Sequence, residues 1–64
     1  MSFIALHAAS RDKPGEEILI NVANIVEIRE VEGRARLITI AGGTILVQES
    51  LATVKAELAA AAAR

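Results

Sequence analysis

The side chains that could do chemistry are few and widely spaced in this sequence. The single histidine, His7, lies among apolar residues near the N-terminus, with no partner for proton transfer beside it. A general base must lie within hydrogen-bond reach of the groups it serves, so a lone histidine indicates no catalytic site. Ser50 precedes an apolar run at helical spacing and is predicted to cap a helix rather than to act as a nucleophile. We therefore expect no enzyme, no metal site and no cofactor.

Arginines in the middle of the chain are better candidates, as binding residues. Arg29 falls mid-strand between aliphatic residues. It fits either an interface or ligand pocket, or a side chain that extends past the aliphatics into water. Arg36 is expected to pair with Glu30 across two strands, the alternative being an anion site. Thr39 and Gln48 share the predicted sheet face of Arg29 and complete the candidate binding residues.

Length and composition bound the class of protein. A chain of 64 residues forms at most one small domain and buries only about 60% of the surface that its unfolded state exposes. It has no Cys, Trp or Tyr, which excludes a disulfide scaffold and a cysteine zinc site. The formal net charge is −1 and no basic stripe is present, which argues against nucleic acid as a partner. Small domains without disulfides or metals often gain stability by oligomerisation, so we expect a homo-oligomer.

The N-terminal residues are apolar but lack the basic leader of a signal peptide. No segment approaches the roughly 20 apolar residues that span a bilayer. The expectation is a cytoplasmic protein without a membrane partner.

Alternating apolar residues and turn signals predict an α+β domain, residues 1–64, that is mainly an antiparallel sheet of four to five strands in a meander, followed by one C-terminal helix. The charged segment around Pro14 and Gly15 is predicted to be a loop, and Asn21 and Asn24 to flank a tight turn. The expected strands cover residues 2–9, 17–21, 25–31, 35–41 and 44–48, and the helix covers about 50–63.

The turns set the expected registers. Gly42-Gly43 is predicted to form a two-residue hairpin loop and Glu32-Gly33-Arg34 a three-residue loop. These lengths place Ile28 opposite Ile38. The resulting aliphatic face, which we expect the helix to cover, consists of Val26, Ile28, Ile38, Ile40, Ile45 and Val47. The other, mixed face consists of Ile25, Glu27, Arg29, Val31, Leu37, Thr39, Thr44, Leu46 and Gln48, and we expect the first strands and another subunit to cover it.

Residues 15–54 also carry a pattern of Gly, an aliphatic before Asn, an Ile-x-x-Ile strand, a Thr-aliphatic strand, a Gly turn and Val-x-Glu-Ser before a helix. This pattern resembles the small swarming-motility proteins of the FlbD/SwrD-like family, and it implies a motility-related accessory protein. The same stretch resembles the strand-and-helix part of LytTR-type DNA-binding domains. The residues that match the motility family are Gly15, Ile20, Asn21, Ile25, Ile28, Thr39, Ile40, Gly43, Val47, Glu49 and Ser50.

Three functions follow as expectations. The first is a non-enzymatic, homo-oligomeric interaction module that docks on a protein partner. The second is a phage-encoded or bacterial oligomer that binds a small anion or nucleotide in pockets between subunits. The third is a DNA-binding module, which the charge balance disfavours.

Overall fold

The residues that the structure describes form five strands followed by one helix, which confirms the predicted α+β class. The computed structural model describes residues 2–9, 11–12 and 14–63; Ser10 and Lys13 of the predicted loop lie outside these ranges. The elements are β1 (Phe3–His7), β2 (Glu17–Asn21), a 3₁₀ turn η1 (Val22–Asn24), β3 (Ile25–Val31), β4 (Arg34–Thr39), β5 (Thr44–Leu46) and α1 (Leu51–Ala62).

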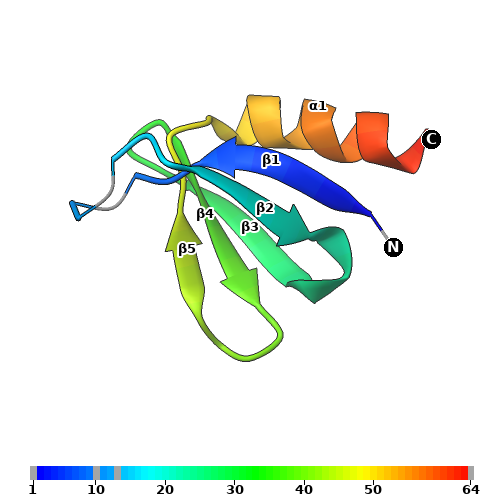
Figure 1. The fold of residues 1–64 in the computed structure, drawn as a ribbon, viewed down its shortest axis with the longest axis horizontal. Helices are drawn as coiled ribbons and strands as arrows, with labels where there is room; N and C mark the ends of the chain where they lie inside the picture. Colours follow the sequence, from blue (N-terminus) through cyan, green and yellow to red (C-terminus); the bar gives the residue numbers. More distant parts are fainter. Residues whose placement is uncertain (1, 10, 13, 64) are drawn as a thin grey trace.

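The strands are divided between two antiparallel sheets rather than following one another in a single meander. β1 pairs with β2, and β3, β4 and β5 form a three-stranded sheet in that order. The end of β1 reaches the second sheet through a bridge between Ala8 and Val47. There the Gln48 amide donates to the His7 carbonyl at 2.8 Å. The two sheets therefore enclose one core, with α1 running beside β1 (Figure 1).

Alternate residues of both sheets fill this core, as the period of a strand requires. The buried residues are Ile4, Leu6, Ile20, Ala35, Leu37, Val47, Val54 and Ala61. Helix α1 contributes Val54 and Ala61, with Leu58 packed against the cluster. Ser50 caps this helix as predicted, because its Oγ accepts a hydrogen bond from the Thr53 amide at 3.2 Å. Within the described ranges, no helix combines the length and apolar character that crossing a bilayer requires.

The predicted register of the β3–β4 hairpin is wrong. Its loop has two residues, so Val31 lies opposite Arg34 and Glu27 lies opposite Ile38. Glu32 and Gly33 both have positive φ, 51° and 82°. Two such residues form the turn that matches the right-handed twist of paired strands. A bulge between Ile25 and Glu27 shifts the register again within the first residues of β3.

The predicted two-residue loop at Gly42-Gly43, between β4 and β5, is also wrong. Leu37 lies opposite Ile45, and the Thr39 amide donates to the Gly43 carbonyl. The loop is therefore Ile40-Ala41-Gly42, with Gly42 at a φ of 86°. The observed loop has three residues where two are predicted. The side chains of β4 therefore lie on the faces opposite to those predicted.

The exchange of faces is visible in the burial of the side chains. Leu37, assigned to the mixed face, is fully buried, whereas Val26 and Ile40, assigned to the core, are 65% and 68% exposed. Helix α1 therefore covers a core that includes Leu37 and excludes Val26 and Ile40.

The turn between β3 and β4 provides a test of stability. Gly33→Ala should destabilise the fold by about 1–3 kcal/mol, because an L-residue at this positive φ is strained. A Cβ at Gly33 meets no atom within 4 Å, so the cost is confined to the backbone. Gly43→Ala is the matched control: its φ is not in the left-handed region and its Cβ would make an ordinary contact, 3.4 Å from Thr39 Oγ1. Chemical denaturation measures both, and equal stabilities of the two variants would contradict this account.

Candidate functional site

The outward side chains of β3, β4 and β5 form a surface that combines arginines with aliphatic residues. We call this surface the arginine face. Arg29 of β3 lies opposite Arg36 of β4, and on its other side Arg36 lies opposite Leu46 of β5. Two further outward residues, Val31 and Arg34, face each other where the hairpin turns. The whole face consists of Glu27, Arg29, Val31, Arg34, Arg36, Ile38, Thr44 and Leu46.

The central pair of this face is electrostatically unfavourable in the isolated chain, since like charges directly opposite each other destabilise a sheet. Arg29 is partly compensated, because its Nε donates to Glu27 Oε1 at 2.6 Å. This hydrogen bond raises the pKa of Arg29 above its ordinary value. Arg36 is not compensated in the same way: its Nε is buried and has no hydrogen-bond partner among the described residues. Burying a guanidinium nitrogen unpaired is costly, so the isolated arginine face carries an uncompensated polar group beside an unfavourable pair of like charges.

Only two of the four predicted binding residues come together. Arg29 and Arg36 are neighbours, although the predicted Arg36–Glu30 pairing is wrong. Glu30 lies opposite Ala35, and its Oε1 accepts a hydrogen bond from the Leu51 amide at 3.3 Å, at the start of α1.

The other two predicted binding residues lie elsewhere. Thr39 Oγ1 donates to the Gly43 carbonyl at 3.3 Å, inside the β4–β5 hairpin. There it lines an open hollow of about 340 Å³ with Asn24, Ile40 and Ala41. Gln48 is at the opposite end of β5, beside the bridge to β1, with its Nε2 close to Gly15. Neither residue belongs to the arginine face.

A second polar cluster, centred on His7, has no counterpart in the sequence analysis. His7 Nδ1 donates to Glu49 Oε2 at 2.7 Å, and the His7 amide donates to Glu49 Oε1 at 2.9 Å. Glu17 lies opposite His7 in the β1–β2 pair. His7 and Glu49 are 42 residues apart in the chain, so no local pattern announces their contact. Glu49 is held in place because it directly precedes the helix cap, Ser50.

The two members of this pair shift each other's ionisation. The hydrogen bond to the Glu49 carboxylate raises the pKa of His7 above its ordinary value. Burial pushes the pKa of Glu49 upward, but the hydrogen bonds from the His7 ring and amide outweigh it, and the pKa is lowered overall. The pair therefore favours a protonated imidazole beside an ionised carboxylate.

These shifts predict how stability depends on pH. A raised histidine pKa stabilises the fold below the unfolded-state pKa, and this contribution disappears as pH rises through the folded-state pKa. The lowered pKa of Glu49 contributes above the unfolded-state value and is lost as pH falls through the folded-state value. We expect a broad stability maximum at mildly acidic pH, between the unfolded-state pKa values of Glu49 and His7. The effect should be small because the His7 side chain is 47% exposed.

Thermal melts across this pH range test the pair. His7→Gln should abolish the decline at the upper side of the maximum, and Glu49→Gln should abolish the declines that the pair causes on both sides. Identical pH profiles for the wild type and both variants would show that the pair contributes nothing to folding.

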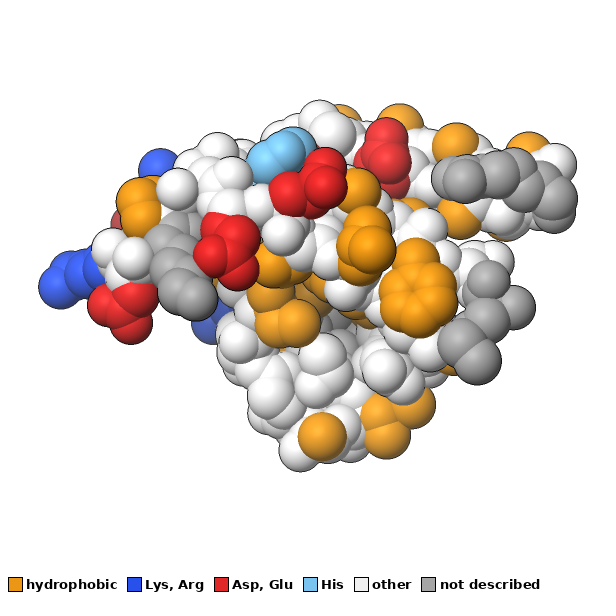
Figure 2. All heavy atoms as spheres, in the orientation of Figure 1, with side chains coloured by type: hydrophobic (Ala, Val, Ile, Leu, Met, Phe, Trp, Pro, Cys, Tyr) orange, Lys and Arg blue, Asp and Glu red, His pale blue; other side chains and the backbone are white. Residues whose placement is uncertain are grey.

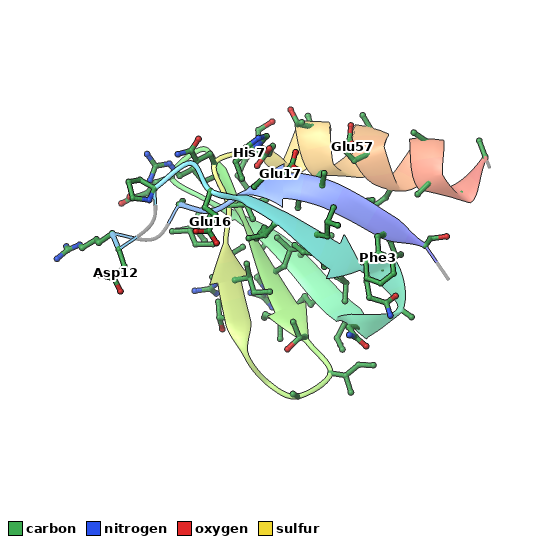
Figure 3. The ribbon with its side chains drawn as sticks, in the orientation of Figure 1. Phe3, His7, Asp12, Glu16, Glu17 and Glu57 are labelled. Atoms are coloured by element: carbon green, nitrogen blue, oxygen red, sulfur yellow. The ribbon has the colours of Figure 1, made fainter. Side chains whose placement is uncertain are left out.

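The outward side of the β1–β2 sheet forms the second exposed surface, which we call the β1–β2 face. Its cross-strand pairs are Phe3–Asn21, Ala5–Leu19 and His7–Glu17. Leu19 is 68% and Phe3 47% exposed. Acidic side chains surround His7 on this side of the molecule, and the visible Lys and Arg side chains gather toward the left edge of the view (Figure 2). Glu17 and Glu57 both lie on this visible surface near His7 (Figure 3).

Within the part of the chain that the structure describes, no three His, Cys, Asp or Glu side chains gather as a metal-ligand set. Comparisons of the chain with protein-family models, with curated proteins and with solved structures found no match. The fold and its surfaces therefore define only a class: a small α+β domain of two antiparallel sheets and a C-terminal helix, with arginines and exposed aliphatic residues on one outer sheet face.

Proposed function

We propose that this protein is a non-enzymatic, homo-oligomeric interaction module that docks through its arginine face. One observation carries the proposal: Arg36 lies between Arg29 and Leu46 on an outward sheet face, and its Nε is buried with no hydrogen-bond partner among the residues that the structure describes. Arginine is enriched in protein interfaces and is a frequent hot spot there.

The surroundings of this arginine pair support docking of a protein. Val31 and Leu46 on the same face are 38% and 37% exposed. Aliphatic side chains beside arginines supply the apolar contact area that a charged surface lacks, and a docked partner would remove them from water. A domain of this size also has a small core, so association adds usefully to its stability. The resemblance of residues 15–54 to swarming-motility proteins supports motility as the setting for such a module.

Light scattering after size-exclusion chromatography at micromolar concentration tests the proposal. We expect the wild type to exceed the mass of one chain and Leu46→Glu to elute as a folded monomer. Ile40→Glu is the matched control, because Ile40 is 68% exposed but lies in the β4–β5 loop, outside the arginine face; it should leave the assembly unchanged. A wild-type monomer that melts cooperatively would refute the proposal.

A second candidate function is binding of a small anionic ligand such as a nucleotide. The two arginines favour it, because Arg29 and Arg36 lie directly opposite each other on an outward sheet face and offer two guanidinium groups to one anion. Arginines recognise phosphate oxygens through paired hydrogen bonds. A nucleoside triphosphate should then raise the melting temperature of the wild type and not that of Arg36→Gln. An unchanged wild-type melting temperature would eliminate this candidate.

A further inference from the structure

The arginine face is poorly suited to dock on a copy of itself. A two-fold symmetric contact places the same surface patch on both sides of the interface. A two-fold contact centred on Arg29 and Arg36, already opposed within one sheet, would bring them against the same two arginines of the other copy. Like charges brought together at an interface cost several kcal/mol. A second copy therefore covers the arginine pair more favourably when it presents a different surface.

The β1–β2 face has the opposite charge. Glu17 is an exposed member of β2 on this face, and Glu57 lies on the same side of the molecule (Figure 3). The only titratable base in its cross-strand pairs, His7, is held by Glu49. At a pH where His7 is neutral, the surface is acidic.

The two faces also match in their apolar content. On β2, Leu19 follows Glu17 at two residues' distance on the same face, roughly 7 Å along a strand. On the arginine face, Leu46 lies opposite Arg36, roughly 5 Å across the sheet. Each face thus offers a charge with an exposed leucine beside it, and the charges are of opposite sign.

The molecule has enough surface for both contacts. A stable interface buries about 800 Å² on each partner. The accessible surface of one chain is 4356 Å², so one such patch takes about a fifth of it. The two faces belong to different sheets on either side of the core, so one copy can engage a neighbour through each of them at the same time.

From this complementarity, and resting on the proposed homo-oligomeric function, we infer that the arginine face of one copy docks on the β1–β2 face of the next. The contact is head-to-tail, with Glu17 of one copy facing the Arg29–Arg36 pair of its neighbour. Such heterologous contacts continue until they close into a ring or extend as a filament.

Two variants that each lack one face test this arrangement at mildly alkaline pH and low salt. Arg29→Glu with Leu46→Glu disables the arginine face, and Glu17→Gln with Leu19→Gln disables the β1–β2 face without adding a positive charge that the new glutamates could bind. These positions are all exposed, so both variants should keep the wild-type circular dichroism spectrum. We expect each variant alone to be monomeric, and an equimolar mixture to form a one-to-one heterodimer and nothing larger, because each variant retains the face that the other has lost.

The outcomes separate the arrangement from the function on which it rests. A wild-type monomer would refute homo-oligomerisation itself. A wild-type oligomer that persists in the Glu17→Gln, Leu19→Gln variant would keep the homo-oligomer and overturn the head-to-tail contact. Monomeric variants that do not combine when mixed would likewise overturn it. Lys55→Glu, a charge change at an exposed position of α1 outside both faces, controls for the effect of charge alone and should assemble as the wild type does.

Discussion

Leu37→Ala is expected to reduce the free energy of unfolding by about 2–5 kcal/mol, the usual range for truncating a well-packed leucine. Leu37 is fully buried in the centre of β4, between Ile28 and Ile45 of the neighbouring strands. The truncation opens a cavity in the buried cluster to which both sheets contribute. A domain of this size has a total stability of about 3–10 kcal/mol, and this one change removes a large part of it.

Ile40→Ala is the matched control for this prediction. The sequence pattern assigns Ile40 to the core, whereas in the structure it is 68% exposed in the β4–β5 loop. Truncating an exposed side chain changes stability by about 0.5 kcal/mol or less. Urea unfolding of the two variants measures the difference. If Ile40→Ala were the more destabilising of the two, the observed register of β4 would be wrong and the predicted register right.

Val54→Asp is expected to have the larger effect and to leave the chain unfolded at room temperature. Val54 is fully buried, where α1 packs on the core. An aspartate there loses the apolar contact and buries a carboxyl group without a partner, a mechanism that costs more than about 4 kcal/mol. That cost is comparable to the whole stability of the domain.

Thr53→Asp places the same new residue one position earlier, on the exposed side of α1. It lies in the first turn of the helix, where a negative charge interacts favourably with the helix dipole, so stability should stay the same or rise slightly. Circular dichroism spectra and thermal melts of the two variants decide the matter. A folded Val54→Asp variant with a wild-type melting temperature would mean that α1 does not dock on the core through this residue.

Local signals in the sequence account for the order and kind of the elements. The bounds of β2 and β3 agree with the predicted residues 17–21 and 25–31, because both are short β-branched runs bounded by turn residues. The helix begins after Ser50 because a side-chain oxygen at that position satisfies an amide of the first turn, a contact within three residues. Interactions of this range are encoded in neighbouring residues and need no tertiary contact.

The faces of β4 were decided by the tertiary structure. Apolar residues occupy both sides of this strand, Leu37 on one and Ile38 on the other, so alternation alone does not choose between them. Ile38 and Ile40 together favour the wrong side as the buried one. In the structure β4 ends at Thr39, so Ile40 does not belong to the strand. A two-residue loop at Gly42-Gly43 selects this side of β4, and of the loop lengths at Gly33 only the three-residue one agrees with it.

The candidate sites also depend partly on the sequence alone and partly on the tertiary structure. The sequence alone indicated Arg29, which falls mid-strand among aliphatic residues, and Arg36, which falls near a predicted loop. The register of each hairpin places these two arginines opposite each other and separates Thr39 and Gln48 from them. One residue more or less in a loop would move the side chains of a strand to the other face. The contact of His7 with Glu49 joins the first strand to the residue before the helix cap. Only the packing of β1 beside the end of β5 brings these two side chains within 2.7 Å, because nothing in either segment by itself specifies the other.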